Sequence, residues 1–371
     1  MCYREAPVLP PALFGEKNVM TFSQRIALYF VPCAGLLLCV SAHAQDWQQQ
    51  TLDGAELTPL IVVGDPNGTP GVTQADFLDP NTPASPFAGV VSLFVDDGTG
   101  NNTGFLCSGT LISPNHILTA AHCFDFTSNG TSDATPGDVT VIFNDTASPT
   151  LVGATALDLH PDFTGFNNPF VNDDLAIITL SAPAPVTAPV YELFATPPTV
   201  GVPLIMVGYG TQGDGVTGFT ANSASYFDKH WGGNFTANGD DDDEGSGSIE
   251  VFLVDFDGPD ASTDTLNDGL SFGNDLEVTI GPGDSGGASF IWTDLSDDLL
   301  ITADELQLFG VNTFSRGSGN LPDAPLFGSQ AGGLIVSAYT DFIGSVIPEP
   351  GMATLILAGL FAGALGRPRA A

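Results

Sequence analysis

Three residues of this chain have the types and the chain order to do chemistry together. Ser285 lies within Gly-Asp-Ser-Gly-Gly at 283–287, His122 precedes Cys123, and Asp174 opens the run Asp-Leu-Ala-Ile. A serine hydroxyl is a poor nucleophile at neutral pH, so it needs a base to take its proton and a buried acid to orient that base. The three residues therefore predict a hydrolase with a serine nucleophile.

The chain order His122, Asp174, Ser285 and the motifs around these residues resemble the trypsin/chymotrypsin family of serine peptidases. The resemblance implies Ser285 as nucleophile, His122 as general base and Asp174 as the acid that holds the histidine. It also implies that the N–H groups of Gly283 and Ser285 form the oxyanion hole. Asp173 is the adjacent rival, but neighbours in a strand point to opposite faces, and the family motif favours Asp174.

Asp284 occupies the position at which trypsin-like enzymes pair an aspartate with a newly released N-terminal amine. The best candidate for that N-terminus is Ile61, in Ile-Val-Val-Gly at 61–64. Leu60 precedes it instead of a basic residue, which excludes trypsin-like activation. Two alternatives follow: another protease trims the chain, or Asp284 is satisfied in some other way.

The substrate pocket is expected around Thr279, Thr313 and Ser315. Thr279 lies six residues before the nucleophile, where trypsins carry an aspartate, so strict cleavage after basic residues is not expected. Ser315 stands where a glycine usually admits large side chains, and Arg316 could attract an acidic one. A preference for small or apolar residues and a preference for acidic residues are the two alternatives.

Both ends of the chain predict export. Arg25, the apolar run 26–40 and Ala-His-Ala at 42–44 predict a signal peptide over 1–44, with Met20 as an alternative start. Pro-Glu-Pro at 348–350, an apolar run and a basic end resemble a PEP-CTERM sorting tail over 348–371, which implies exosortase-type machinery as a partner. An ordinary C-terminal membrane anchor is the alternative. Between them lie a candidate propeptide, 45–85, and the peptidase domain, 86–347.

Cys107 and Cys123 are the two cysteines outside the leader, and an even pair in an exported chain predicts one disulfide. It would close a short loop beside His122, worth roughly 3 kcal/mol in the loop-entropy model.

The charge is strongly acidic, with a formal net charge of -36. Lys229 and Arg316 are the only basic residues in 45–347. Such a charge excludes nucleic acid and anionic membrane surfaces as partners, and it favours cationic peptides and divalent cations. Solvation in a saline habitat explains it equally well. The acidic run 240–244 approaches an EF-hand loop but has Val251 at the twelfth position, so no cofactor or metal site is expected, and calcium is the one candidate ion.

The body is expected to be all-β, with two six-stranded antiparallel barrels of the trypsin type and a short C-terminal helix that begins in 336–343. The polar segments 211–248 and 293–305 are expected to be surface insertions. We expect a monomeric, exported serine endopeptidase that acts on polypeptides. The alternatives are a non-catalytic surface or matrix protein that binds cations, and an esterase with the same triad. Apolar runs between turn residues predict strands over the following segments: Val90–Val95, Ile117–Ala121, Val139–Phe143, Leu175–Leu180, Leu204–Tyr209, Ile249–Val254, Ala288–Trp292 and Leu306–Thr313.

Overall fold

A computed structural model gives the fold of the body of the chain. The predicted signal peptide, sorting tail and most of the run 240–244 lie outside the residues that it describes. Within the described part, no helix is both long and apolar enough to cross a bilayer. The described residues are 50–51, 62–64, 74–100, 103–166, 173–196, 200–220, 223–237, 239–241, 249–295, 300–316 and 326–347.

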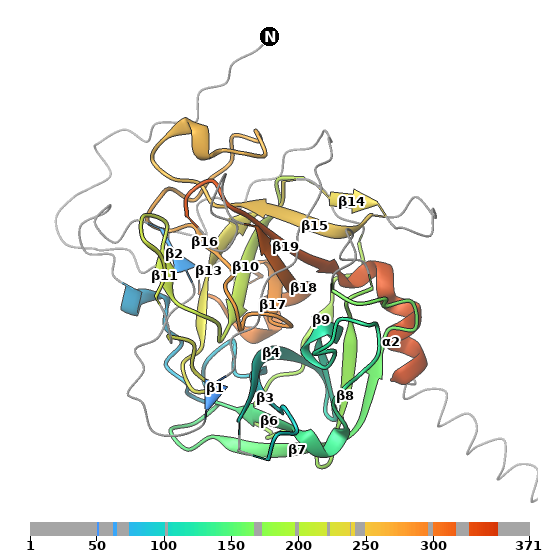
Figure 1. Ribbon diagram of the computed structural model, residues 1–371. Helices are drawn as coiled ribbons and strands as arrows, with labels where there is room; N and C mark the ends of the chain where they lie inside the picture. Colours follow the sequence, from blue (N-terminus) through green and yellow to red (C-terminus); the bar gives the residue numbers. More distant parts are fainter. Residues whose placement is uncertain are drawn as a thin grey trace, which may run out of the picture.

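The first barrel is a closed ring of six antiparallel strands, drawn at the bottom of Figure 1. The ring runs β4-β3-β6-β7-β8-β5, and a ladder between β4 and β5 closes it. The short strand β1 (Gln50–Thr51) adds to the outer side of β4. The six strands are β3 (Val90–Asp96), β4 (Thr103–Ser113), β5 (His116–Thr119), β6 (Val139–Phe143), β7 (Thr150–Leu159) and β8 (Ala176–Leu180).

The second barrel is an open ladder that curves into a half-barrel in the upper part of Figure 1. Its order is β13-β10-β17-β18-β19-β15, with β14 (Gly239–Asp241) beyond β15. The Asn234 side chain bridges the open side, since its Nδ2 donates to the carbonyls of Asp255 and Val278, both at 2.8 Å. The strands are β10 (Pro203–Gly208), β13 (His230–Phe235), β15 (Ile249–Asp255), β17 (Ala288–Trp292), β18 (Leu306–Arg316) and β19 (Gln330–Ile335).

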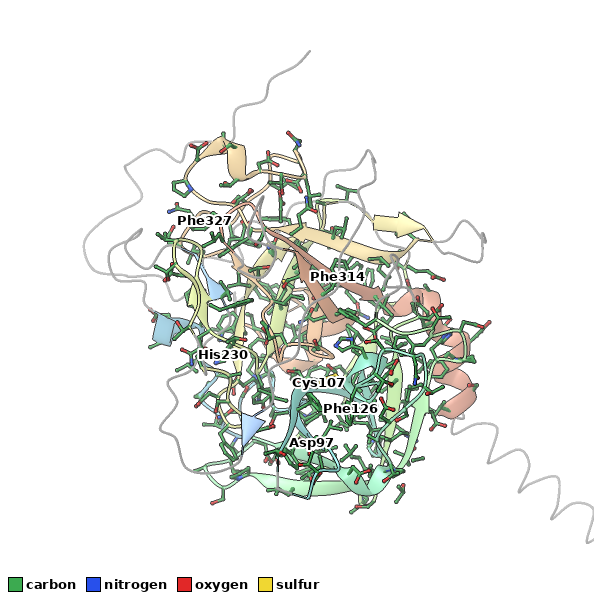
Figure 2. The ribbon with its side chains drawn as sticks, viewed as in Figure 1. Asp97, Cys107, Phe126, His230, Phe314 and Phe327 are labelled. Atoms are coloured by element: carbon green, nitrogen blue, oxygen red, sulfur yellow. A yellow bond between two sulfur atoms is a disulfide. The ribbon has the colours of Figure 1, made fainter. Side chains whose placement is uncertain are left out.

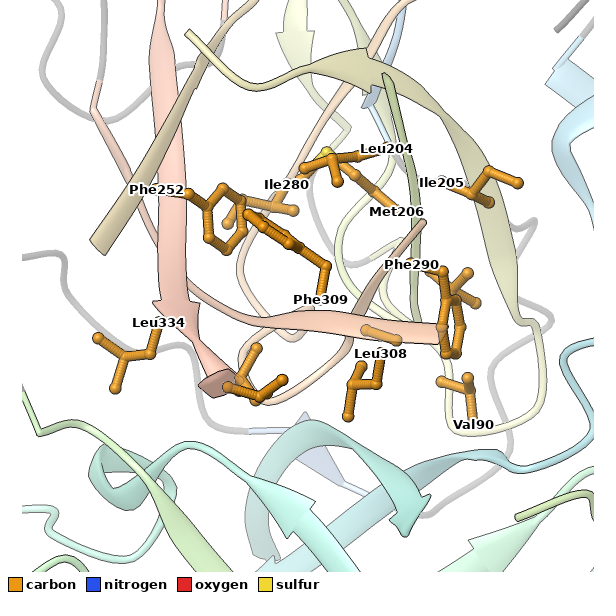
Figure 3. Packing of buried hydrophobic residues seen from close by; sticks show 14 of the residues in the cluster. Val90, Leu204, Ile205, Met206, Phe252, Ile280, Phe290, Leu308, Phe309 and Leu334 are labelled. Carbon is orange, nitrogen blue, oxygen red and sulfur yellow. The ribbon is translucent and has the colours of Figure 1, made fainter. Parts of the chain in front are cut away.

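Strand β3 shows how the sequence joins the two barrels. Its side chains alternate between faces, as strand geometry requires. Val91 and Leu93 fill the first barrel, whereas Val90 and Phe94 belong to the larger core that contains the second. Figure 3 shows Val90 beside Phe290 in that core. A strand buried on both faces explains the nearly continuous apolar run that the sequence shows there.

All eight predicted strands are present within a residue or a few of their expected ends, and the expected all-β fold with two barrels is confirmed. The expectation for 211–248 was wrong, because this segment is no simple insertion. It contains β11 (Gly213–Asp214), β12 (Gly218–Phe219) and the barrel strand β13. The sequence of β13, His-Trp-Gly-Gly-Asn-Phe, has no β-branched residue, so propensity and periodicity gave no strand signal.

The chain ends of the described body pack against both barrels. The strand β2 (Val62–Val63) lies between β11 and β16 (Val278–Thr279), with Val62 opposite Thr279. At the other end, η8 (Val336–Tyr339) leads into α2 (Thr340–Val346), so the expected C-terminal helix is present and begins with a 3-10 turn. His160 contacts the rings of Tyr339 and Phe342, which holds this end against the first barrel (Figure 1).

Candidate active site

His122 lies at the end of β5, in the short helix η4 (Ala121–Cys123), and only 2% of it is exposed. The next residue, Cys123, forms the expected disulfide with Cys107 on β4. Figure 2 labels Cys107 near the centre of the molecule, where the two barrels meet. The disulfide and the tight turn therefore fix the histidine at the interface between the barrels.

Asp174 contacts His122 through both of its carboxylate oxygens. The backbone N–H of His122 donates to Oδ1 over 2.7 Å, and the ring Nδ1 forms a very short hydrogen bond with Oδ2. Asp174 is fully buried, and the ring of Phe166 flanks the imidazole with 4.4 Å between centroids. A carboxylate on Nδ1 fixes the tautomer in which Nε2 is the basic nitrogen of the neutral ring.

Asp173 points to the other side. Its Oδ1 lies 3.1 Å from Nδ1 of His160, and its backbone N–H donates to the hydroxyl of Tyr339 over 3.1 Å. Its φ of 60° places the residue in the left-handed region, at the sharp turn before β8. The two adjacent aspartates therefore contact two different histidines, as expected, but the left-handed turn at Asp173 separates them and not the alternation of a strand, since β8 begins only at Ala176.

Ser285 lies in the turn between β16 and β17, and this turn is bonded to the first barrel. The backbone N–H of Ser108 donates to the Ser285 carbonyl over 2.7 Å, and the Ser108 hydroxyl donates to the Gly283 carbonyl over 2.9 Å. Sγ of Cys123 is 3.9 Å from the Ser285 carbonyl oxygen. The turn therefore packs against β4 and against Cys123, the neighbour of His122, and Ser285 is 7% exposed.

The backbone of this turn divides its N–H groups into two sets. Those of Asp284, Gly286 and Gly287 donate to protein carbonyls, at 3.0, 2.7 and 2.8 Å. Within the described part of the chain, the N–H groups of Gly283 and Ser285 donate to no protein acceptor. The φ values of Gly283 and Gly286 are 101° and 83°, so both glycines are needed for this backbone path.

Asp284 is buried among backbone donors. Its Oδ1 accepts from Gly210 N–H over 2.7 Å, and its Oδ2 accepts from Gly281 N–H over 2.8 Å. Burial raises the pKa of Asp284 to about 7, and the two hydrogen bonds oppose that shift. A side chain at Gly208 or Gly210 would collide with the carboxyl group, which explains the glycines of the Gly-Tyr-Gly turn.

The three residues predicted to form the pocket are all buried. Thr279 lies on β16 opposite Val62, and Thr313 and Ser315 lie two residues apart on β18. The Thr313 hydroxyl donates to the Val311 carbonyl over 3.2 Å. All three positions are uncharged.

Comparison with known proteins bears on this arrangement. A family model described as Trypsin matches residues 82–230, which include His122 and Asp174 and end before Ser285. Brachyurin of Leptuca pugilator is 35% identical over 120 residues, which are 32% of this chain and 45% of that protein. These matches support a trypsin-like serine peptidase.

Two further relatives have names of the same kind. Chymotrypsin-C of Bos taurus is 35% identical over 88 residues, 24% of this chain and 30% of that protein. Trypsin of Saccharopolyspora erythraea is 31% identical over 109 residues, 28% of this chain and 40% of that protein. The chain spans less than half the length of each of these relatives.

Sequence reasoning missed Ser108 as a residue that positions the candidate site. Besides its two bonds to the Ser285 turn, its hydroxyl accepts from the backbone N–H of Tyr209 over 3.1 Å. One buried residue thereby connects β4, the Gly-Tyr-Gly turn at 208–210 and the Ser285 turn. Its place directly after Cys107 was the available signal, but a serine within an apolar strand carries no pattern of its own.

Proposed function

We propose that this protein is an exported serine endopeptidase in which Ser285, His122 and Asp174 form the catalytic triad. The observation that carries the proposal is the double contact of Asp174 with His122, combined with the bonds from Ser108 that hold the Ser285 turn against β4, beside the disulfide of Cys123. A peptidase fold kept for binding alone would have no need of this set.

In the proposed reaction, Oγ of Ser285 attacks the carbonyl carbon of the scissile bond while Nε2 of His122 takes the hydroxyl proton. The resulting imidazolium is stabilised by the ionised Asp174. The tetrahedral intermediate then breaks its C–N bond, and the imidazolium gives its proton to the leaving amine. Water attacks the acyl-enzyme with His122 again as base, which releases the acid and restores the serine.

The N–H groups of Gly283 and Ser285 are the proposed oxyanion hole. Among the described residues they donate to no protein acceptor, whereas the N–H groups of Asp284, Gly286 and Gly287 do. Donors held in place before the reaction stabilise the charge that develops on the carbonyl oxygen, and the loss of one such donor costs about 10²–10³ in rate.

We further propose that the pocket accepts uncharged side chains. Thr279, Thr313 and Ser315 are neutral and buried, so a charged substrate side chain would find no charge among these positions to offset its desolvation. A library of peptides that vary at the residue before the cleaved bond tests this. Preference for small or apolar residues agrees with the proposal, and preference for acidic residues contradicts it.

Export by the signal peptide, processing of the PEP-CTERM-type tail and action as a monomer complete the proposal, and they rest on the sequence patterns alone. Release of Ile61 to pair with Asp284 stays a prediction. Intact-mass analysis of active protein tests it: a chain that begins at Ile61 supports the pairing, and an active chain that begins at Gln45 contradicts it.

The proposed activity is tested by labelling the purified protein with a fluorophosphonate, beside Ser285→Ala. Labelling that the substitution abolishes supports an activated serine, and comparison of amide with ester turnover separates a peptidase from an esterase. A protein that stays unlabelled, including after its chain is trimmed to begin at Ile61, is a binding protein, and the proposal fails.

A further inference from the structure

The loop between β15 and β16, residues 256–277, contains a cluster of carboxylates that the proposed peptidase chemistry does not use. It stands at the top of the molecule in Figure 1, drawn in gold. Asp255 ends β15, Asp257 follows two residues later, and Asp264 comes directly after the 3-10 turn η6 (Ala261–Thr263). We call these three residues the loop cluster.

The loop cluster has the dimensions of a cation site. One carboxylate oxygen from each of Asp255, Asp257 and Asp264 lies within 4.8 Å of the other two. Calcium binds oxygens at about 2.3–2.6 Å, so ligands on opposite sides of one ion are at most roughly 5 Å apart. The three oxygens can therefore share a single ion.

Backbone N–H groups hold Asp255 and Asp264 in place, but one carboxylate oxygen of Asp257 receives no hydrogen bond within the described residues. Oδ2 of Asp255 accepts from the backbone N–H of Leu266 over 2.8 Å, and Oδ1 of Asp264 accepts from that of Asp268 over 3.1 Å. Asp257 is only 6% exposed, yet within the described residues its Oδ1 has no hydrogen-bond partner. A buried carboxylate oxygen without a donor is costly, and this carboxyl group also belongs to a cluster of three.

The basic residues of the body offer little compensation. Lys229 is fully buried and contacts Asp79. Arg316 lies at the end of β18 opposite Gln330, which lies opposite Asp255, so its backbone is two strands away from the cluster. An ion from solution and the arginine are thus the two sources of positive charge to be distinguished.

We propose that the loop cluster is a calcium site, with Asp255, Asp257 and Asp264 as its carboxylate ligands. The donors are all hard oxygens, with no histidine or cysteine among them, and their arrangement in an irregular loop suits the flexible six- to eight-oxygen shell of Ca²⁺ better than the strict octahedron of Mg²⁺. Water and backbone carbonyls would supply the remaining ligands. This site is distinct from the acidic run 240–244.

The loop cluster is connected to the predicted substrate pocket through Glu277. Its Oε1 accepts from the backbone N–H of Asp257 over 2.8 Å, and its Oε2 accepts from that of Phe272 over 2.8 Å. The next residues along the chain are β16, with Thr279. Bound calcium would therefore hold the loop that leads directly into one wall of the pocket.

The test measures calcium binding to the full-length protein carrying Ser285→Ala, so it needs no enzymatic activity and its result is independent of the proposed function. Equilibrium dialysis in physiological salt with excess magnesium should give one calcium ion per chain. Asp257→Asn should weaken that binding at least about tenfold, because it removes one ligand charge. The melting temperature should rise with calcium in the parent protein and stay nearly unchanged in Asp257→Asn.

Asp260→Asn is the matched control, because Asp260 lies in the same loop and caps η6 through Ser262 N–H without belonging to the cluster. It should bind calcium like the parent protein. Circular dichroism of all variants in EDTA checks that they fold.

Absence of saturable calcium binding in the parent protein, or an equal loss of binding in Asp257→Asn and Asp260→Asn, overturns the proposal. Binding that Asp242→Asn abolishes also overturns it, by moving the ion to 240–244. If calcium raises the melting temperature only after Arg316→Gln, and not in the parent protein, the arginine is the counterion of the cluster and the proposal fails.

Discussion

Asp174 and Asp257 are both buried carboxylates, but the protein surrounds them differently. Asp174 receives hydrogen bonds on both oxygens from one residue, His122, and it sits between elements of a closed barrel. Asp257 lies in a long loop of the open barrel, its Oδ1 has no hydrogen-bond partner within the described residues, and one of its oxygens lies within 4.8 Å of the carboxylates of Asp255 and Asp264. The fold itself supplies hydrogen-bond donors to both oxygens of Asp174, whereas Oδ1 of Asp257 would gain a partner from a bound cation.

This difference separates two uses of buried charge. A carboxylate with its own protein donors is fixed in one geometry under all conditions, which suits a residue that must orient a base. A carboxylate without donors leaves the native state dependent on a solute, since binding to the folded form alone stabilises it by mass action. Substitutions that change what each carboxylate contacts test this difference.

The largest effect is expected for Asp174→Asn. The amide cannot accept from both His122 groups as the carboxylate does, so the histidine loses its tautomer and kcat should fall about 10⁴-fold. Asp173→Asn changes the adjacent residue, which contacts His160 instead, and it should retain most activity. Steady-state hydrolysis of a peptide substrate measures both. Equal losses would mean that either aspartate can serve the histidine.

Asp79 is a third buried carboxylate, and it forms an ion pair with Lys229. Nζ of Lys229 lies 3.4 Å from its Oδ1 and donates to the Phe87 carbonyl over 2.8 Å. Lys229→Met should cost about 3–5 kcal/mol of unfolding free energy, because it removes the only cation beside the buried Asp79 in the described residues, although Asn81 N–H and the Ser85 hydroxyl still donate to that carboxylate. Denaturant unfolding measures this loss, and the double variant Lys229→Met, Asp79→Asn should recover part of it. A single variant as stable as the parent would contradict the importance of the pair.

The stability of the protein should depend on pH through the buried carboxylates Asp257 and Asp268. The pKa of Asp257 and that of Asp268 are raised from 3.8 to about 7, so between these values the native state binds more protons than the unfolded chain. Stability therefore falls as pH rises from about 4 to about 7. Thermal melts in EDTA should show this fall, and calcium should reduce it.

Asp284 has a raised pKa in the same range and contributes a similar slope that calcium should not affect. The informative quantity is thus the difference between melts with calcium and with EDTA at each pH. A difference that stays constant from pH 5 to pH 7.5 would contradict the role of the loop cluster.

The smallest effect is expected for Asp257→Asn in EDTA. The substitution removes one uncompensated charge and provides an amide that can donate to a neighbouring carboxylate, so the melting temperature should rise by a few degrees. Asp260→Asn should leave it unchanged. A lower melting temperature in EDTA would mean that Asp257 is completed by protein groups after all, like Asp174.

The sequence predicted the fold and the candidate triad because both follow short local patterns. The strands followed apolar runs, and the choice between Asp173 and Asp174 followed from the family motif Asp-Leu-Ala. The strand β13 escaped prediction because its glycines and polar residues are compatible with a turn, and its place is set by pairing with β10 over six residues.

The loop cluster escaped prediction for a different reason. Its members are spread over 255–264 without a regular spacing, and loop closure brings them together. The run of acidic residues at 240–244 attracted attention instead, because a run is visible in a sequence and a convergence of isolated residues is not. Ser108 and Asn234 were missed in the same way, since each matters through contacts with distant parts of the chain.

The burial of Lys229 limits which proteases can cleave this protein and which reagents can modify it. Within 45–347, Lys229 and Arg316 are the only residues after which a lysine- or arginine-specific protease could cut, and the lysine side chain is fully enclosed in the fold. The native body therefore offers such proteases hardly any site, and amine-directed reagents find no accessible lysine in it. Digests of residues 45–347 made with trypsin will therefore contain few peptides by which to detect the protein.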